Sequence, residues 1–128
     1  MTRWSDHTGD LIPRPEQTPS ALRAALAVVA PERLPEMDAS QRAAVTEAIE
    51  QSGITPLRMF LIQWAAVIEI ERFPDTAREL RRVEYLARIA EDPEESRRYV
   101  QAAGDIIRAA HGAVGLSSRV TRVDTSSR

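Results

Sequence analysis

The sequence predicts an all-α fold, a compact bundle of about five helices around one central apolar helix, with flexible termini. The central helix is expected at residues 55–73, where apolar side chains cover most of the circumference at about 100° per residue. Such a helix has to be surrounded by other helices or by a partner, because a surface helix needs only one apolar stripe. Capping residues and prolines divide the remaining chain into helix-sized segments, and no alternating pattern competes as a strand.

The composition limits the classes of protein to which the chain can belong. Its 128 residues correspond to one domain, and the lack of cysteine excludes disulfides, thiolate nucleophiles and zinc–thiolate sites. The net charge of −2 is not the basic excess that is expected of a nucleic-acid-binding protein. No stretch reaches the roughly 18 uninterrupted apolar residues of a membrane span. We therefore expect a cytoplasmic protein that has no membrane partner and for which nucleic acid is an unfavoured partner.

The helical domain is expected between residues 18 and 112. Residues 1–17 contain glycine and proline without apolar periodicity, which predicts a flexible arm with Trp4 and Ile12 as its only anchors. Residues 113–128 are mostly small and polar, which predicts a flexible tail.

The first two helices of the domain are predicted from their start and stop signals. Thr18 is expected to cap the first helix, which ends at Pro31. Residues 32–37 are expected to form an irregular or single-turn connection whose Leu34 and Met37 contact the core. A capping box at Asp38 is then expected to start the second helix. Gly53 is expected to end that helix in the left-handed conformation.

The remaining helices are predicted in the same way. Thr55 starts the central helix, and Pro74 stops it because the residue before a proline is disfavoured in the helical region. Asp75 opens a fourth helix, and Asp92 with the following proline opens a fifth. This last helix is expected to stop at Gly112.

The chain lacks a pattern of catalytic residues, so we expect no enzyme, no cofactor and no metal site. Its histidines are His7, in the arm, and His111, which is expected to stabilise the C-terminal end of the fifth helix. The glycines are scattered singly and form no phosphate-binding loop. Serines of the tail have no base nearby in the sequence.

Charged residues in and after the central helix are expected to pair within the chain. Glu69 and Glu71 point about 200° from each other, which excludes a paired acid and base on this helix alone. We expect Glu69 to pair with Arg72 on a polar stripe, and Glu71 to pair with an arginine of the fourth helix. In that helix, Glu84 is expected to pair with Arg88 at the i,i+4 spacing.

Residues 18–75 resemble a family of small, uncharacterised helical proteins of actinobacteria. The resemblance lies in TPSALRAAL at Thr18–Leu26, in the Pro-Glu-Arg turn at residues 31–33, and in Leu57, Leu61 and Trp64 of the central helix. Some members of that family are antitoxin-like and are encoded beside toxins of the ribosome-dependent ribonuclease class. The resemblance implies an antitoxin-like role.

Our leading hypothesis is a non-enzymatic interaction protein that binds a protein partner or a second copy of itself as a homodimer. The apolar surface of the central helix and its one-sided neighbours exceeds what five helices easily cover. The candidate interaction face consists of Leu22, Leu26, Val29, Phe60 and Val67.

Two alternatives belong to other classes of protein. One is a binder of a small apolar ligand, with a cavity lined by Met59, Phe60 and Trp64. The weaker one is a nucleic-acid-binding regulator, for which the arginine-rich fourth and fifth helices would supply the charge. Acidic residues alternate with those arginines, which is more typical of a solvated face with internal ion pairs.

Overall fold

The computed structural model describes the backbone of residues 9–126 and the side chains of residues 9–115. The described chain is helical throughout apart from its first residues and short connections, so the predicted all-α fold class is confirmed. Its elements are α2 (Pro19–Val29), the 3₁₀ helix η1 (Pro31–Arg33), α3 (Leu34–Gln51), α4 (Thr55–Glu71), α5 (Pro74–Ile89) and α6 (Pro93–Ser126).

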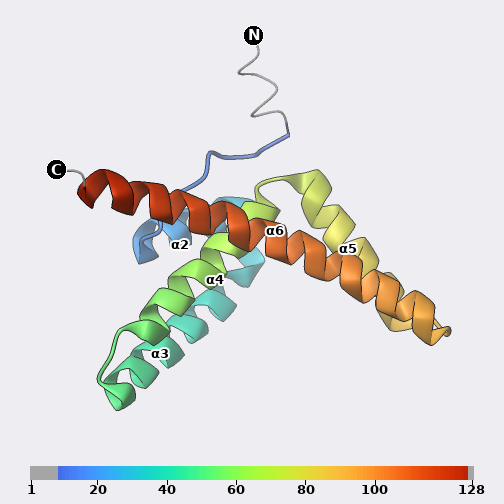
Figure 1. Ribbon diagram of the computed structural model, residues 1–128, viewed down its shortest axis with the longest axis horizontal. Helices are drawn as coiled ribbons and strands as arrows, with labels where there is room; N and C mark the ends of the chain where they lie inside the picture. Colours follow the sequence, from blue (N-terminus) through green and yellow to red (C-terminus); the bar gives the residue numbers. More distant parts are fainter. Residues whose placement is uncertain (1–8, 127–128) are drawn as a thin grey trace, which may run out of the picture.

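Two pairs of antiparallel helices diverge from a common junction (Figure 1). One pair is α3 with α4, and the other is α5 with α6, whose second half crosses α4 near α2. Only α4 contacts each of the four other α-helices in the described part of the chain. This arrangement confirms α4 as the central helix that the apolar pattern of residues 55–73 predicts.

The core lies where α2, α3 and α6 pack against α4. Trp64 is 1% exposed, and its Nε1 atom donates a hydrogen bond to Ser40 Oγ at 3.1 Å. Leu34 and Met37 contact the same core, as the sequence predicts for the connection before the second helix. The largest fully buried side chains are Trp64, Leu22, Leu26, Met37, Ile68 and Val114.

The start and end of α3 differ from the prediction. The helix begins at Leu34, because a proline in the first turn of a helix lacks only an N–H that would be unpaired there anyway. Asp38 therefore lies inside the helix, where it accepts two hydrogen bonds of 3.0 Å from Arg23 instead of capping. At the other end Ser52, not Gly53, adopts the left-handed conformation, with φ of 54°.

The prediction that the last helix stops at Gly112 is wrong, since α6 continues without a break to Ser126. Val114 is 1% exposed in the core, and its carbonyl accepts a hydrogen bond of 2.9 Å from Gln17 Nε2. Burial of Val114 offsets the roughly 1 kcal/mol by which a glycine weakens a helix interior. His111 consequently lies inside α6, so its predicted role at a helix end is also wrong.

The prediction of a flexible arm is corrected for residues 9–17, which pack along the C-terminal end of α4. Leu11 N donates to the Arg72 carbonyl at 2.7 Å, and Arg72 Nη1 donates to Asp10 Oδ2 at 3.1 Å and to the Ile12 carbonyl at 3.0 Å. Ile12 also packs against the core. Trp4 and His7 lie outside the described residues.

Ion pairs hold this N-terminal segment, and they move Arg72 from the expected polar stripe to the interior. Arg72 is only 7% exposed and pairs with Glu69 at 3.0 Å, which confirms the predicted pair. Glu69 also accepts two hydrogen bonds from Arg14, at 2.9 and 3.0 Å. Burial disfavours the charge of Glu69, but the hydrogen bonds from Arg14 and Arg72 outweigh burial and hold its pKa below the ordinary value.

Candidate functional site

A cavity of about 560 Å³ lies at the junction of the two helix pairs, and we call it the junction cavity. Apolar side chains of three helices form its floor, and polar side chains from η1 and from the same helices stand around them. The floor residues are Ala66, Val67, Ile70, Ala77, Leu80 and Ile107. The polar residues are Glu32, Arg33, Gln63, Glu71, Arg81, Glu84 and His111.

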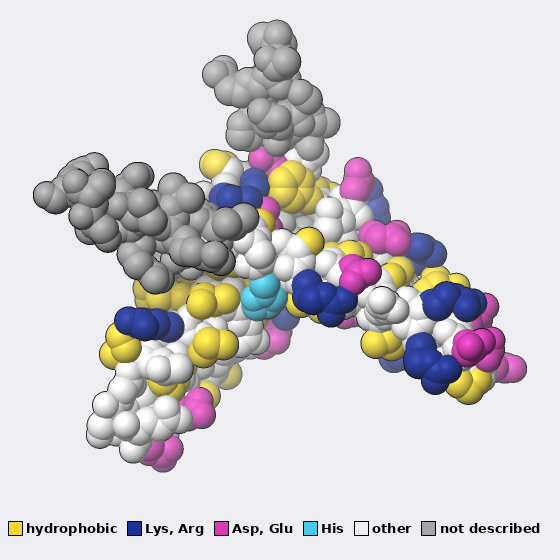
Figure 2. Space-filling view, viewed as in Figure 1, with side chains coloured by type: hydrophobic (Ala, Val, Ile, Leu, Met, Phe, Trp, Pro, Cys, Tyr) yellow, Lys and Arg dark blue, Asp and Glu magenta, His cyan; other side chains and the backbone are white. Residues whose placement is uncertain are grey.

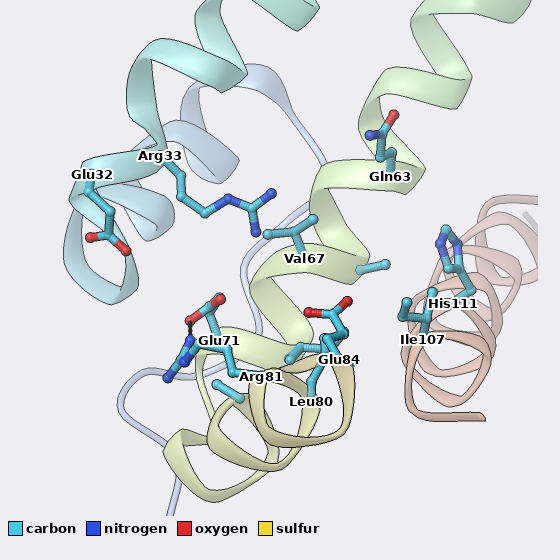
Figure 3. A pocket seen from close by; sticks show the side chains of 13 residues that line it. Glu32, Arg33, Gln63, Val67, Glu71, Leu80, Arg81, Glu84, Ile107 and His111 are labelled. Atoms are coloured by element: carbon cyan, nitrogen blue, oxygen red, sulfur yellow. Dashed lines mark ion pairs between the residues drawn. The ribbon is translucent and has the colours of Figure 1, made fainter. Parts of the chain in front are cut away.

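Segments far apart in the sequence supply the walls of the junction cavity. Figure 3 shows α4 between η1, which carries Glu32 and Arg33, and α6, which carries Ile107 and His111. Glu84 projects from α5 toward the same space and lies below Val67 in this view. The cavity therefore exists because η1 and α6 pack on opposite sides of one face of α4.

Two neighbouring cavities extend this space in both directions. A cavity of about 340 Å³ between α3 and α4 shares Gln63 with the junction cavity and is also lined by Met59 and Phe60. A cavity of about 520 Å³ between α5 and α6 shares Glu84 and Ile107 with it. Because these lining residues are shared, the three cavities lie next to one another, and we call them together the α4 groove.

The surface around the groove differs between the two helix pairs. Hydrophobic side chains gather over the α3/α4 pair in Figure 2, whereas side chains of both charges crowd the far end of the α5/α6 pair. Three large apolar side chains that line the groove reach solvent, namely Met59, which is 58% exposed, Val100, which is 59% exposed, and Ile107, which is 37% exposed. The groove thus offers apolar contact area that the described chain does not cover.

Arginines of the junction cavity are already engaged within the chain. Arg33 donates two hydrogen bonds to Glu36, at 3.0 and 3.2 Å, and its guanidinium lies 5.3 Å from the centre of the Trp64 ring. Arg81 pairs with Glu71 at 3.7 Å, which confirms the prediction that an arginine of the fourth helix neutralises Glu71. Both ion pairs reach the surface and contribute little to stability. They hold the guanidinium groups of Arg33 and Arg81 next to carboxylates of the chain itself.

Other carboxylates of the groove make no ion pair among the described residues. They are Glu32 on η1, Glu47 on α3 and Glu84 on α5. The predicted pair between Glu84 and Arg88 is not formed, because the Arg88 guanidinium lies 5.9 Å from the centre of the Tyr85 ring. Glu84 is left facing the groove.

The polar groups of the junction cavity do not form a catalytic arrangement among the described residues. His111 and Glu84 come from different helices, and no hydrogen bond joins them within the described part of the chain. A search of the described residues also found no group of three or more His, Cys, Asp or Glu that could hold a metal ion. What the arrangement offers is an apolar floor with a polar rim, which suits binding of an amphipathic surface.

Most residues of the predicted interaction face are buried in the core, so this prediction needs correction. Leu22 and Leu26 are fully buried and Phe60 is only 4% exposed, so none of them can carry a surface contact of any size. Val29 is partly buried against the core, and Val67 is partly buried in the floor of the junction cavity. Of the expected face, only Val67 and the edge of Phe60 reach the groove.

Of the three residues predicted to line a ligand cavity beside Trp64, only two line a cavity. Met59 and Phe60 line the cavity between α3 and α4, as expected, but Trp64 does not. Its ring is covered by the Arg33 guanidinium, so the tryptophan belongs to the core. Sequence reasoning assigned Glu84 and His111 other roles and missed that both line the junction cavity. The i,i+4 spacing of Ile107 and His111 could have indicated that these two residues share one face of a helix.

No protein family, curated protein or solved structure matches this chain. The resemblance to the actinobacterial helical family stays a prediction. None of the helices in the described part of the chain combines the length and apolar character that a membrane crossing needs.

Proposed function

We propose that the protein is a non-enzymatic interaction protein whose α4 groove binds a helical segment of a protein partner. The observation that carries this proposal is that three cavities with apolar and polar lining adjoin one another at Gln63, Glu84 and Ile107. A groove with an apolar floor and a polar rim is the surface on which amphipathic helices dock. The antitoxin-like role that the family resemblance implies is one specific version of this function.

The dimensions of the groove support a helical occupant. From Met59 to Ile70 the floor follows α4 for about 17 Å at the rise of 1.5 Å per residue, which is about three helical turns. A helix of that length presents apolar side chains at i, i+3, i+4 and i+7 along one line. Those side chains would contact Met59, Val67 and Ile70, while η1 and α6 flank the occupant.

The test starts from affinity purification of the full chain in its native host, followed by mass spectrometry of the bound material. The partner is then purified and its dissociation constant measured with three variants. Met59→Asp and Ile107→Asp place a charge in the groove and should each weaken binding by about tenfold or more. Ile49→Asp is the matched control, because Ile49 is 73% exposed and lines none of the three cavities.

The outcomes separate the remaining candidates. Equal binding by the groove variants and the control would overturn the proposal. Recovery of a small molecule that only the groove variants lose would favour the ligand-binding alternative, for which a cavity of about 560 Å³ has a suitable size. Sedimentation of a dimer that Ile107→Asp dissolves would identify the partner as a second copy.

A further inference from the structure

Acidic residues outnumber basic ones in the two cavities of the α4 groove that lie along α4. The cavities at the junction and between α3 and α4 are lined by four glutamates and only two arginines. Both arginines are engaged, Arg33 with Glu36 outside these cavities and Arg81 with Glu71. The charges that remain open to an occupant in these two cavities are therefore all negative. In the third cavity, between α5 and α6, Arg88 accompanies Glu84, but its guanidinium lies against the Tyr85 ring.

These open carboxylates stand at separate places around the floor. Glu47 lines the cavity between α3 and α4, at one end, and Glu84 lies at the other end, where the junction cavity meets the cavity between α5 and α6. Glu32 stands on η1, across α4 from α6 (Figure 3). A helix lying on α4 would pass between them with its flanks near carboxylates.

We propose that the α4 groove selects a basic amphipathic helix, one with an apolar stripe flanked by lysine or arginine. The inference rests on the proposed function and adds the chemistry of the partner. The apolar stripe would contact Val67 and Ile70, and the basic flanks would lie near Glu47 and Glu84. Charge complementarity of this kind selects among partners and speeds association more than it raises affinity.

The test uses the full chain with two designed peptides of about 15 residues, which is long enough for measurable helix content. One carries a leucine stripe flanked by lysines, and the other is identical except that glutamates replace the lysines. The basic peptide should bind and the acidic one should not, with affinity that falls as salt rises. Glu47→Gln and Glu84→Gln should each weaken binding of the basic peptide about two- to fivefold, as expected of exposed charge pairs.

Glu50→Gln is the control, because Glu50 is also exposed on α3, makes no ion pair among the described residues, and lines none of the three cavities. It should leave the dissociation constant unchanged, and all three variants should keep the melting temperature. Equal binding of both peptides, or equal effects of Glu50→Gln and Glu84→Gln, would overturn the inference. A native partner lost with Ile107→Asp but retained fully with Glu47→Gln and Glu84→Gln would overturn only the basic selectivity and leave the proposed function standing.

Discussion

Replacing Gly112 with alanine should raise the free energy of unfolding by about 0.5–1 kcal/mol, the difference between these residues in a helix interior. Gly112 lies within α6, is exposed, and does not have a positive φ angle. A Cβ atom built on it meets no heavy atom within 4 Å, so the substitution creates no clash. If the helix instead ended there in the left-handed conformation, alanine would destabilise the protein by about 1 kcal/mol.

The sign of the change decides between the two conformations. Urea denaturation followed by far-ultraviolet circular dichroism measures the free energy of unfolding of the parent and of the variant. The shift of the urea midpoint gives the difference between them when both proteins have the same m-value. Gly104→Ala is the matched control, since its Cβ would stand 3.0 Å from Arg108 Nη1 and the arginine would have to move. We expect a smaller gain there. A loss of stability with Gly112→Ala would refute the continuous α6 helix.

Three other predictions address the core and the N-terminal segment. Trp64→Ala should lower the free energy of unfolding by about 3–5 kcal/mol, while Arg58→Ala, on an exposed position, should change it by under about 0.5 kcal/mol in the same denaturation assay. Deleting residues 1–17 should lower the melting temperature, because the ion pairs and Ile12 contacts are lost; an unchanged value would mean that the segment does not dock. Arg14→Ala should destabilise the protein at neutral pH, and the difference should vanish in acid. The pKa of Glu69 is lowered in the folded state, so its stabilisation is present above the unfolded value of 4.5 and lost as the pH falls through the folded one. A difference from the parent that persists unchanged in acid would contradict this assignment.

The fold class could be predicted because the apolar pattern of one helix requires that other elements surround it. The helix at residues 55–73 is apolar on most sides, so neighbours have to cover it, and α4 indeed contacts each of the other α-helices. The start of α6 was equally predictable. Asp92 accepts a hydrogen bond of 3.2 Å from Glu94 N, as an N-terminal capping residue does.

Helix ends were harder to predict because local signals compete with distant contacts. An aspartate followed by glutamine three residues later fits a capping box, yet Asp38 pairs with Arg23 of α2 instead. Glycine is common just after a helix but is also tolerated inside one. Whether the helix ends at Gly112 or continues through it depends on Val114. That residue is buried by segments that are distant in the sequence.

The groove itself could not be predicted from local patterns. Its lining combines Arg33, Gln63, Glu84 and His111, which belong to four different elements of the fold. Sequence periodicity tells which face of a helix is apolar, but it does not tell which part of that face a neighbour covers. On α4 the neighbours cover Trp64 and leave Met59 exposed, although both lie on apolar parts of the helix.

The position of Arg33 explains why the core and the groove are separate although they share α4. Its guanidinium covers the Trp64 ring on one side and pairs with Glu36 on the other, so a charged side chain stands between the core and the groove. An indole left open to the groove would favour a flat apolar ligand, as the hypothesis of a cavity near Trp64 supposed. With Arg33 in place, the groove offers aliphatic contacts bordered by carboxylates, and such a surface favours an amphipathic helix over a small apolar ligand.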